Sequence, residues 1–144
     1  MSKSYKLVNV CPVFITDDIK KTVKYYVEKL GFKYAEHYDK IETFATIYRD
    51  SIEIIIVQKE KGEIKSNQSR YGSGYDAYID TESLEGIDYI YEEYKQKGVK
   101  IIDELAITDY GSYEFAFEDI DGRHIGVGLI ADKEKFFEKS NYLD

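Results

Sequence analysis

The sequence predicts an α+β fold made of two βαβββ modules, whose strands form a curved mixed sheet around a groove. Three observations support this prediction. An apolar strand, an amphipathic helix and a closing glycine follow one another near the start of the chain. The same order returns after roughly 65 to 70 residues, which indicates an internal repeat. Each helix is followed by short segments rich in β-branched and aromatic residues, a composition typical of strands.

The first module is expected over about residues 6–58 and opens with a strand at residues 8–15. Residues 16–18 then supply side-chain oxygens that can cap a helix. One face of that helix carries apolar residues at helical spacing: Ile19, Val23, Tyr26, Val27 and Leu30. Gly31 ends the helix, because glycine readily takes the left-handed C-terminal conformation. Three strands complete the module, at residues 32–38, 44–48 and 52–58.

Residues 59–73 are polar, contain glycine and serine, and are predicted to link the modules. The second module is expected over about residues 74–130 and repeats the first. Its strands are predicted at residues 74–80, from 99–102 onward, at 113–118 and at 123–130. Its helix has an apolar face of Leu84, Ile87, Ile90, Tyr91 and Tyr94, and ends at Gly98. A surface helix is predicted at 132–142. The whole chain is predicted to form one domain.

Composition excludes several classes of function. The chain of 144 residues carries 28 acidic and 20 basic side chains, a formal charge of −8, which argues against a nucleic-acid partner. No apolar run reaches the roughly 18 residues that cross a membrane, and no secretory signal precedes the first strand. The single cysteine, Cys11, cannot form an internal disulfide. These observations favour a cytoplasmic protein. The 15 tyrosines are more than one small core needs, so some should line a surface or a cavity.

The segments CPVFITDDIKKTVKYYVEKLGF and YGSYEFAFEDIDGRHIGVGL resemble the vicinal oxygen chelate superfamily, which includes glyoxalase I, extradiol dioxygenases and bleomycin-resistance proteins. The resemblance covers about residues 8–129. For the enzymes of this superfamily it implies a divalent metal held by His or Glu from the first and last strands of each module. The matching positions here are Cys11, Glu53 or Ile54, Gly74 or Tyr75, and Gly126. A thiol and one carboxylate cannot complete such a site, so no metal and no cofactor are predicted.

The segment Val10–Cys11–Pro12–Val13, together with Tyr110–Gly111, is similar to the metal-free bleomycin-resistance branch of the superfamily. That similarity implies a homodimer that sequesters a planar or cationic antibiotic-like ligand without chemistry. Two alternatives stay open at this stage. One is a metal-dependent lyase, isomerase or dioxygenase with a displaced site, and the other is a metal-free enzyme using His124 or a tyrosine.

Six residues are predicted to bind the ligand. Phe44 and Tyr110 match aromatic positions of the branch that the chain resembles, and Tyr113 is included because it lies close to Tyr110. Asp76 and Tyr78 should share one face of their strand, with Tyr75, Ala77 and Ile79 on the other. Asp76 could then offset a positive charge on the ligand. Gly126 should leave room for the ligand, because glycine within a strand often marks a close approach.

Overall fold

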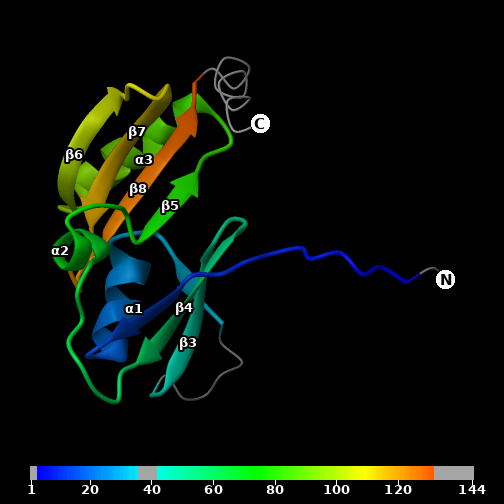
Figure 1. Ribbon diagram of the computed structural model, residues 1–144, viewed down its shortest axis with the longest axis vertical. Helices are drawn as coiled ribbons and strands as arrows, with labels where there is room; N and C mark the ends of the chain where they lie inside the picture. The colour runs from blue at the N-terminus through cyan, green and yellow to red at the C-terminus, as the bar shows by residue number, and fades with distance from the viewer. Residues whose placement is uncertain (1–2, 36–41, 132–144) are drawn as a thin grey trace. The chain divides into compact units, whose positions relative to one another are not determined.

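The computed structural model describes residues 3–35 and 42–131. The chain divides into two compact units, Met1–Gly62 and Glu63–Asp144, and each unit has a four-stranded mixed sheet of its own. In both units the order is strand, helix and three strands (Figure 1). This confirms the predicted α+β class and the two βαβββ modules. The joining of the two sheets into one, and the single domain, stay predictions.

Unit 1 has its strands in the order β1-β4-β3-β2, with β1 parallel to β4 and the other pairs antiparallel. Its elements are β1 (Val13–Thr16), α1 (Ile19–Glu28), β2 (Lys33–Tyr34), β3 (Phe44–Arg49) and β4 (Ile52–Gln58). Helix α1 packs on β3 and β4. Alternate strand residues on the α1 side are buried: Phe14, Ala45, Ile47, Ile54 and Ile56. The other side, the apolar face, carries Val13, Ile15, Phe44 and Tyr48, which are each at least 39% exposed.

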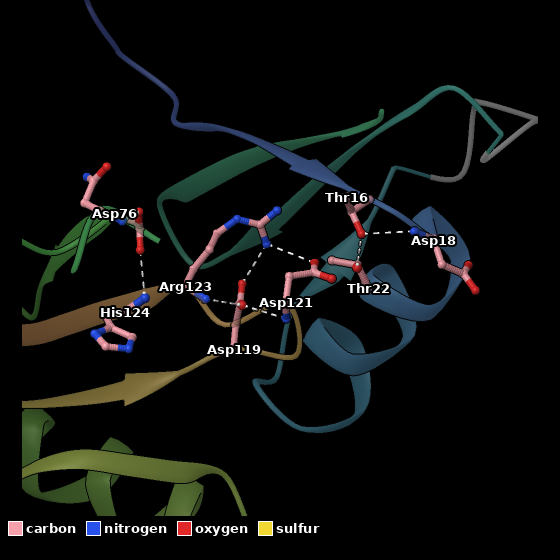
Figure 2. Close-up of polar contacts among 9 residues, drawn as sticks. Thr16, Asp18, Thr22, Asp76, Asp119, Asp121, Arg123 and His124 are labelled. Carbon is pink, nitrogen blue, oxygen red and sulfur yellow. Dashed lines mark hydrogen bonds and ion pairs between the residues drawn. The ribbon is translucent and has the colours of Figure 1, made fainter. Parts of the chain in front are cut away.

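The entry to α1 follows the predicted cap. The Asp18 carboxylate accepts from the Lys21 amide at 3.2 Å. The Thr16 and Thr22 hydroxyls, both buried, share a hydrogen bond of 2.7 Å (Figure 2). The helix ends before Gly31, whose φ of 77° lies in the left-handed region. Polar side chains at residues 16–18 therefore fix where the strand stops and the helix starts.

Unit 2 repeats this arrangement with the strand order β5-β8-β7-β6, in which β5 and β8 are parallel. Its elements are α2 (Asn67–Tyr71), β5 (Ala77–Asp80), α3 (Leu84–Gln96), β6 (Lys100–Ile107), β7 (Ser112–Glu118) and β8 (His124–Ile130). Helix α3 covers one side of the sheet (Figure 1). There the Tyr94 ring meets the Phe117 ring edge-on, with centroids 5.1 Å apart. This aromatic contact forms the centre of the unit 2 core together with buried Phe115, Ile87 and Ile125.

The turn between β7 and β8 is held by a buried ion pair. Asp119 and Arg123 are 4% and 5% exposed, and Arg123 Nη1 lies 2.9 Å from Asp119 Oδ2. The other Asp119 oxygen accepts from the amides of Asp121 and Arg123 at 2.9 and 3.0 Å (Figure 2). The acidic motif at residues 119–122 therefore has a structural role in closing the hairpin.

Three predicted elements differ from the structure. Strand β1 begins at Val13 instead of residue 8, and residues 3–12 form no strand. Pro12 fits that start, because it has no amide to donate to a ladder. Helix α2 lies within the predicted linker, and β5 begins at Ala77, three residues later than predicted. The predicted helix at 132–142 lies outside the described residues. No helix in the described ranges is both long and apolar enough to cross a membrane.

Candidate functional site

The side of the unit 2 sheet away from α3 carries a cluster of tyrosines around one carboxylate. We call it the tyrosine face and define it by Tyr75, Tyr78, Tyr110, Ser112, Glu114, Gly126 and Gly128. Strand register brings its members together, because Gly126 pairs with Tyr78 of β5 and Gly128 pairs with Glu114 of β7. Glu114 is only 4% exposed. A carboxylate buried to this extent must be satisfied by hydrogen bonds.

Three phenols donate to Glu114. The Tyr75 hydroxyl lies 3.1 Å from Oε2 and the Tyr78 hydroxyl lies 3.3 Å from Oε1. The Tyr110 hydroxyl donates to Oε1 as well. Ser112 Oγ lies 2.7 Å from the Tyr78 hydroxyl and extends the network. Glu114 is therefore held by neutral donors.

Burial and the Glu114 charge raise the pKa of these tyrosines. Burial is the first cause for Tyr110, followed by its hydrogen bond to Glu114, and together they raise its pKa to about 12. Burial is also the leading cause for Tyr75 and Tyr78, whose pKa values rise above the ordinary tyrosine value with Glu114 contributing. The three phenols consequently stay protonated at neutral pH and keep donating to the carboxylate.

Gly126 is required by two tyrosine rings, and Gly128 is required by the Tyr78 hydroxyl and by strand β7. A Cβ at residue 126 would lie 2.8 Å from Tyr78 Cδ2 and 3.0 Å from the Tyr75 ring. A Cβ at residue 128 would lie 2.5 Å from Glu114 Cβ and 2.8 Å from the Tyr113 carbonyl oxygen. The space beside the Gly126 Cα is thus taken by two side chains of this chain. Gly126 was predicted to leave room for a ligand, and that room is filled by Tyr75 and Tyr78.

A cavity of about 500 Å³ opens beside Tyr75 within unit 2. Eight residues line it: Gln68, Gly72, Ser73, Gly74, Tyr75, Ile102, Asp103 and His124. The Tyr75 hydroxyl, which donates to Glu114, also lies 3.3 Å from Asp103 Oδ2. Tyr75 therefore belongs to both the cavity wall and the tyrosine face. The volume lies within the range of roughly 300–1,000 Å³ that is typical of small-molecule pockets.

Asp76 joins two backbone segments beside this cavity. Its two carboxylate oxygens accept from the backbone amides of Asn67, at 2.9 Å, and His124, at 2.8 Å. Figure 2 shows the second of these bonds, which reaches the start of β8. The Asn67 side chain in turn donates to the Tyr75 carbonyl at 3.2 Å. The segment from α2 to Tyr75 is thereby fixed to β8 along one wall of the cavity.

The structure brings together four of the six predicted ligand residues in unit 2. Tyr78, Tyr110 and Gly126 lie on the tyrosine face, and Asp76 accepts from the amide of His124, which lines the adjoining cavity. Tyr113 lies apart from them, because its hydroxyl donates to Asp88 of α3. Phe44 belongs to unit 1, where it is 41% exposed on the apolar face.

Sequence reasoning missed Tyr75, Asp103 and Glu114. Tyr75 was assigned to the side of the strand opposite Tyr78, and this was wrong: the two rings lie side by side, with centroids 6.1 Å apart. The reason is that β5 begins only at Ala77, so strand alternation does not extend to Tyr75. The side of the sheet on which Glu114 lies could have been predicted. Glu114 alternates with Tyr113 and Phe115 along β7, so its side chain lies on the opposite face from theirs.

The positions that match the metal ligands of the superfamily's enzymes do not fit a metal ion here. Gly126 has no side-chain donor, and the Tyr75 phenol is engaged with two carboxylates. The Cys11 thiol lies 3.4 Å from Glu53 Oε2, and its pKa is raised by desolvation and by this carboxylate. Among residues 3–35 and 42–131, no three His, Cys, Asp or Glu side chains are placed to hold a metal ion. We therefore derive no chemistry through a metal.

Comparison with known proteins gives one family and many solved structures. The family model described as the glyoxalase/bleomycin resistance protein/dioxygenase superfamily matches residues 9–127. No curated protein matches significantly. A glyoxalase/bleomycin resistance protein/dioxygenase from Alicyclobacillus acidocaldarius is 17% identical, with a TM-score of 0.70 over 93% of this chain and 98% of its own.

Two further structures carry names that point in different directions. The bleomycin-binding protein from Streptomyces verticillus, solved with copper(II)-bleomycin, is 22% identical, with a TM-score of 0.63 over 86% of this chain and 97% of its own. A lactoylglutathione lyase from Agrobacterium tumefaciens is 10% identical, with a TM-score of 0.64 over 87% of this chain and 95% of its own. At these identities the likeness establishes the fold alone.

Proposed function

The chain belongs to the glyoxalase/bleomycin resistance protein/dioxygenase superfamily, and we propose that it acts as a metal-free binding protein that sequesters a small planar or cationic antibiotic-like ligand. The observation that carries this proposal is the unit 2 cavity of about 500 Å³ with the Tyr75 ring in its wall. Aromatic faces bind planar and cationic groups. The likeness to a bleomycin-binding protein supports the same class of ligand.

The chemistry of the tyrosine face favours binding over catalysis. The pKa values of Tyr75 and Tyr110 are raised, and both phenols donate hydrogen bonds to Glu114. A tyrosine that acts as a base at neutral pH needs a lowered pKa instead. The arrangement therefore supplies fixed donors and flat rings. We also propose that the protein works as a cytoplasmic homodimer in the bleomycin-resistance-like branch. The exposed apolar face of unit 1 supports pairing with a second copy.

The first test is the melting temperature with and without metal-free bleomycin. Ligand at about a hundred times its dissociation constant should stabilise the protein by roughly 2.7 kcal/mol. For a chain of this size that is a rise in melting temperature of roughly 5–11 °C. A Ser73→Tyr variant should lose the rise, because the new side chain occupies the cavity, and Ser4→Tyr should retain it.

Two results would contradict the proposal. One is an unchanged melting temperature at saturating bleomycin concentrations. The other is a stoichiometric divalent ion in the purified protein, which would favour the metal-dependent enzymes of the superfamily instead. Metal analysis by mass spectrometry on protein prepared without added metal gives the second result directly.

A further inference from the structure

The Tyr75 hydroxyl lies between two carboxylates and can satisfy only one of them. Its oxygen is 3.1 Å from Glu114 Oε2 and 3.3 Å from Asp103 Oδ2. A phenol has a single proton to donate. Glu114 is buried and Asp103 is exposed, so leaving Glu114 without the proton costs more free energy than leaving Asp103 without it. The Tyr75 proton therefore belongs to Glu114, and Asp103 keeps an oxygen that can accept from a ligand.

The negative charges at this end of the cavity have no ion-pair partner in the described part of the chain. No lysine or arginine there lies within 4.0 Å of Asp103 or Glu114, whereas Glu118 pairs with Lys100 and Asp119 pairs with Arg123. His124 is the one lining residue that can become cationic. Its Nε2 lies 3.4 Å from Glu118 Oε1, so Glu118 offsets its charge when it is protonated.

We propose that the cavity selects ligands that carry a protonated amine, with Asp103 accepting from the ammonium group and the Tyr75 ring lying beside it. This inference rests on the proposed binding function and names the chemical class of its ligand. An ammonium group offers donors to the free Asp103 oxygen. It is also attracted to the face of a neutral tyrosine ring. A carboxylate ligand would meet Asp103 and Glu114 as like charges, and a neutral alcohol would gain only an uncharged hydrogen bond.

Three probes of similar size and different charge test the inference at pH 7: 2-phenylethylamine, 2-phenylethanol and 3-phenylpropionate. Each is titrated into the full chain, and the dissociation constant is taken from amide shifts in nuclear magnetic resonance spectra. A hydrogen bond to a charged group is worth about 1.5–3 kcal/mol, against about 1 for a neutral one. The amine should therefore bind roughly 2- to 30-fold more tightly than the alcohol, and 3-phenylpropionate should bind most weakly.

Two aspartate variants test whether Asp103 supplies the negative charge that binds the amine. Asp103→Asn should weaken binding of the amine by roughly 2- to 30-fold, because it replaces a charged acceptor by a neutral one, and should leave binding of the alcohol unchanged. Asp50→Asn removes the same charge from the turn between β3 and β4, outside the cavity lining, and should change neither. Asparagine suits that position because residue 50 has a φ of 50°.

The outcomes separate this inference from the function on which it rests. Equal affinity for the amine and the alcohol would overturn the selection of amines and leave the binding function standing. Tight amine binding that survives Asp103→Asn would overturn the assignment to Asp103. If none of the three probes shifts the amides of Tyr75, Asp103 or His124, the inference is overturned, and the melting temperature with bleomycin decides separately on the proposed function.

Discussion

Gly126 and Gly128 illustrate how single residues shape the tyrosine face. Both lie on β8, where a side chain would normally point toward the face, and both are instead covered by tyrosine rings or by β7. Glycine costs backbone entropy in a strand. Here that cost is offset because three phenols can reach the buried Glu114 carboxylate.

Two glycine-to-alanine changes should therefore have opposite effects on the free energy of unfolding. Gly128→Ala places a Cβ 2.8 Å from the Tyr113 carbonyl, and the resulting overpacking should lower the free energy of unfolding by about 1–3 kcal/mol. Gly86→Ala on α3 meets only ordinary contacts at 3.5 Å, and should raise stability by about 1 kcal/mol through helix propensity. Urea denaturation measures both. Equal effects of the two changes would contradict the packing argument.

Among the elements, α2 and β5 show where sequence patterns reach their limit. Long amphipathic helices and alternating strands were predictable: β4 matches its predicted bounds and α1 its predicted apolar face. Helix α2 has only five residues and buries none of them, so it has no apolar periodicity to detect. Its position depends on Asp76, a residue nine positions away that no local pattern connects to it.

Asp76→Ala should loosen the attachment of helix α2 to the rest of unit 2. The change leaves the amides of Asn67 and His124 without their carboxylate acceptor, and loss of hydrogen bonds to a charged group should destabilise the protein by about 1–3 kcal/mol. Hydrogen exchange should accelerate at these two amides above all others. Asp109→Ala, at an exposed aspartate before β7, is the matched control. Unchanged protection of both amides in Asp76→Ala would show that another contact holds α2.

At the scale of the whole molecule, the two modules share a plan but differ in chemistry. Both have a closing glycine at φ near 77°, Gly31 and Gly98, and both have the parallel outer strand of the βαβββ unit. The side of each sheet away from its helix differs: unit 1 presents Val13, Ile15 and Phe44, and unit 2 presents tyrosines around Glu114. The repeat could be predicted from the sequence, because hydrophobic spacing encodes the elements. The tyrosine face could be predicted only in part, because it depends on contacts between β5, β7 and β8.

This difference predicts that unit 1 supplies the surface for pairing. Sedimentation should give the wild-type protein twice the 16.8 kDa mass of the chain. Ile15→Lys puts a charge on the apolar face and should give monomers. Ile107→Lys makes the same change at an isoleucine of β6 that is 70% exposed, and should leave the dimer intact. A monomeric wild type, or equal dissociation of both variants, would contradict the assignment, provided that circular dichroism shows folded protein.

The rings packed over Gly126 also limit how this chain can evolve. The resemblance places a metal-ligating carboxylate of the superfamily's enzymes at this position, so Gly126→Glu would be the shortest step toward such a ligand. Any side chain there would collide with Tyr78 and Tyr75, at 2.8 and 3.0 Å from its Cβ. A smaller residue must therefore first replace a tyrosine, at the expense of the donors to Glu114. The order of substitutions is constrained, and each intermediate along that route would be less stable than the present protein.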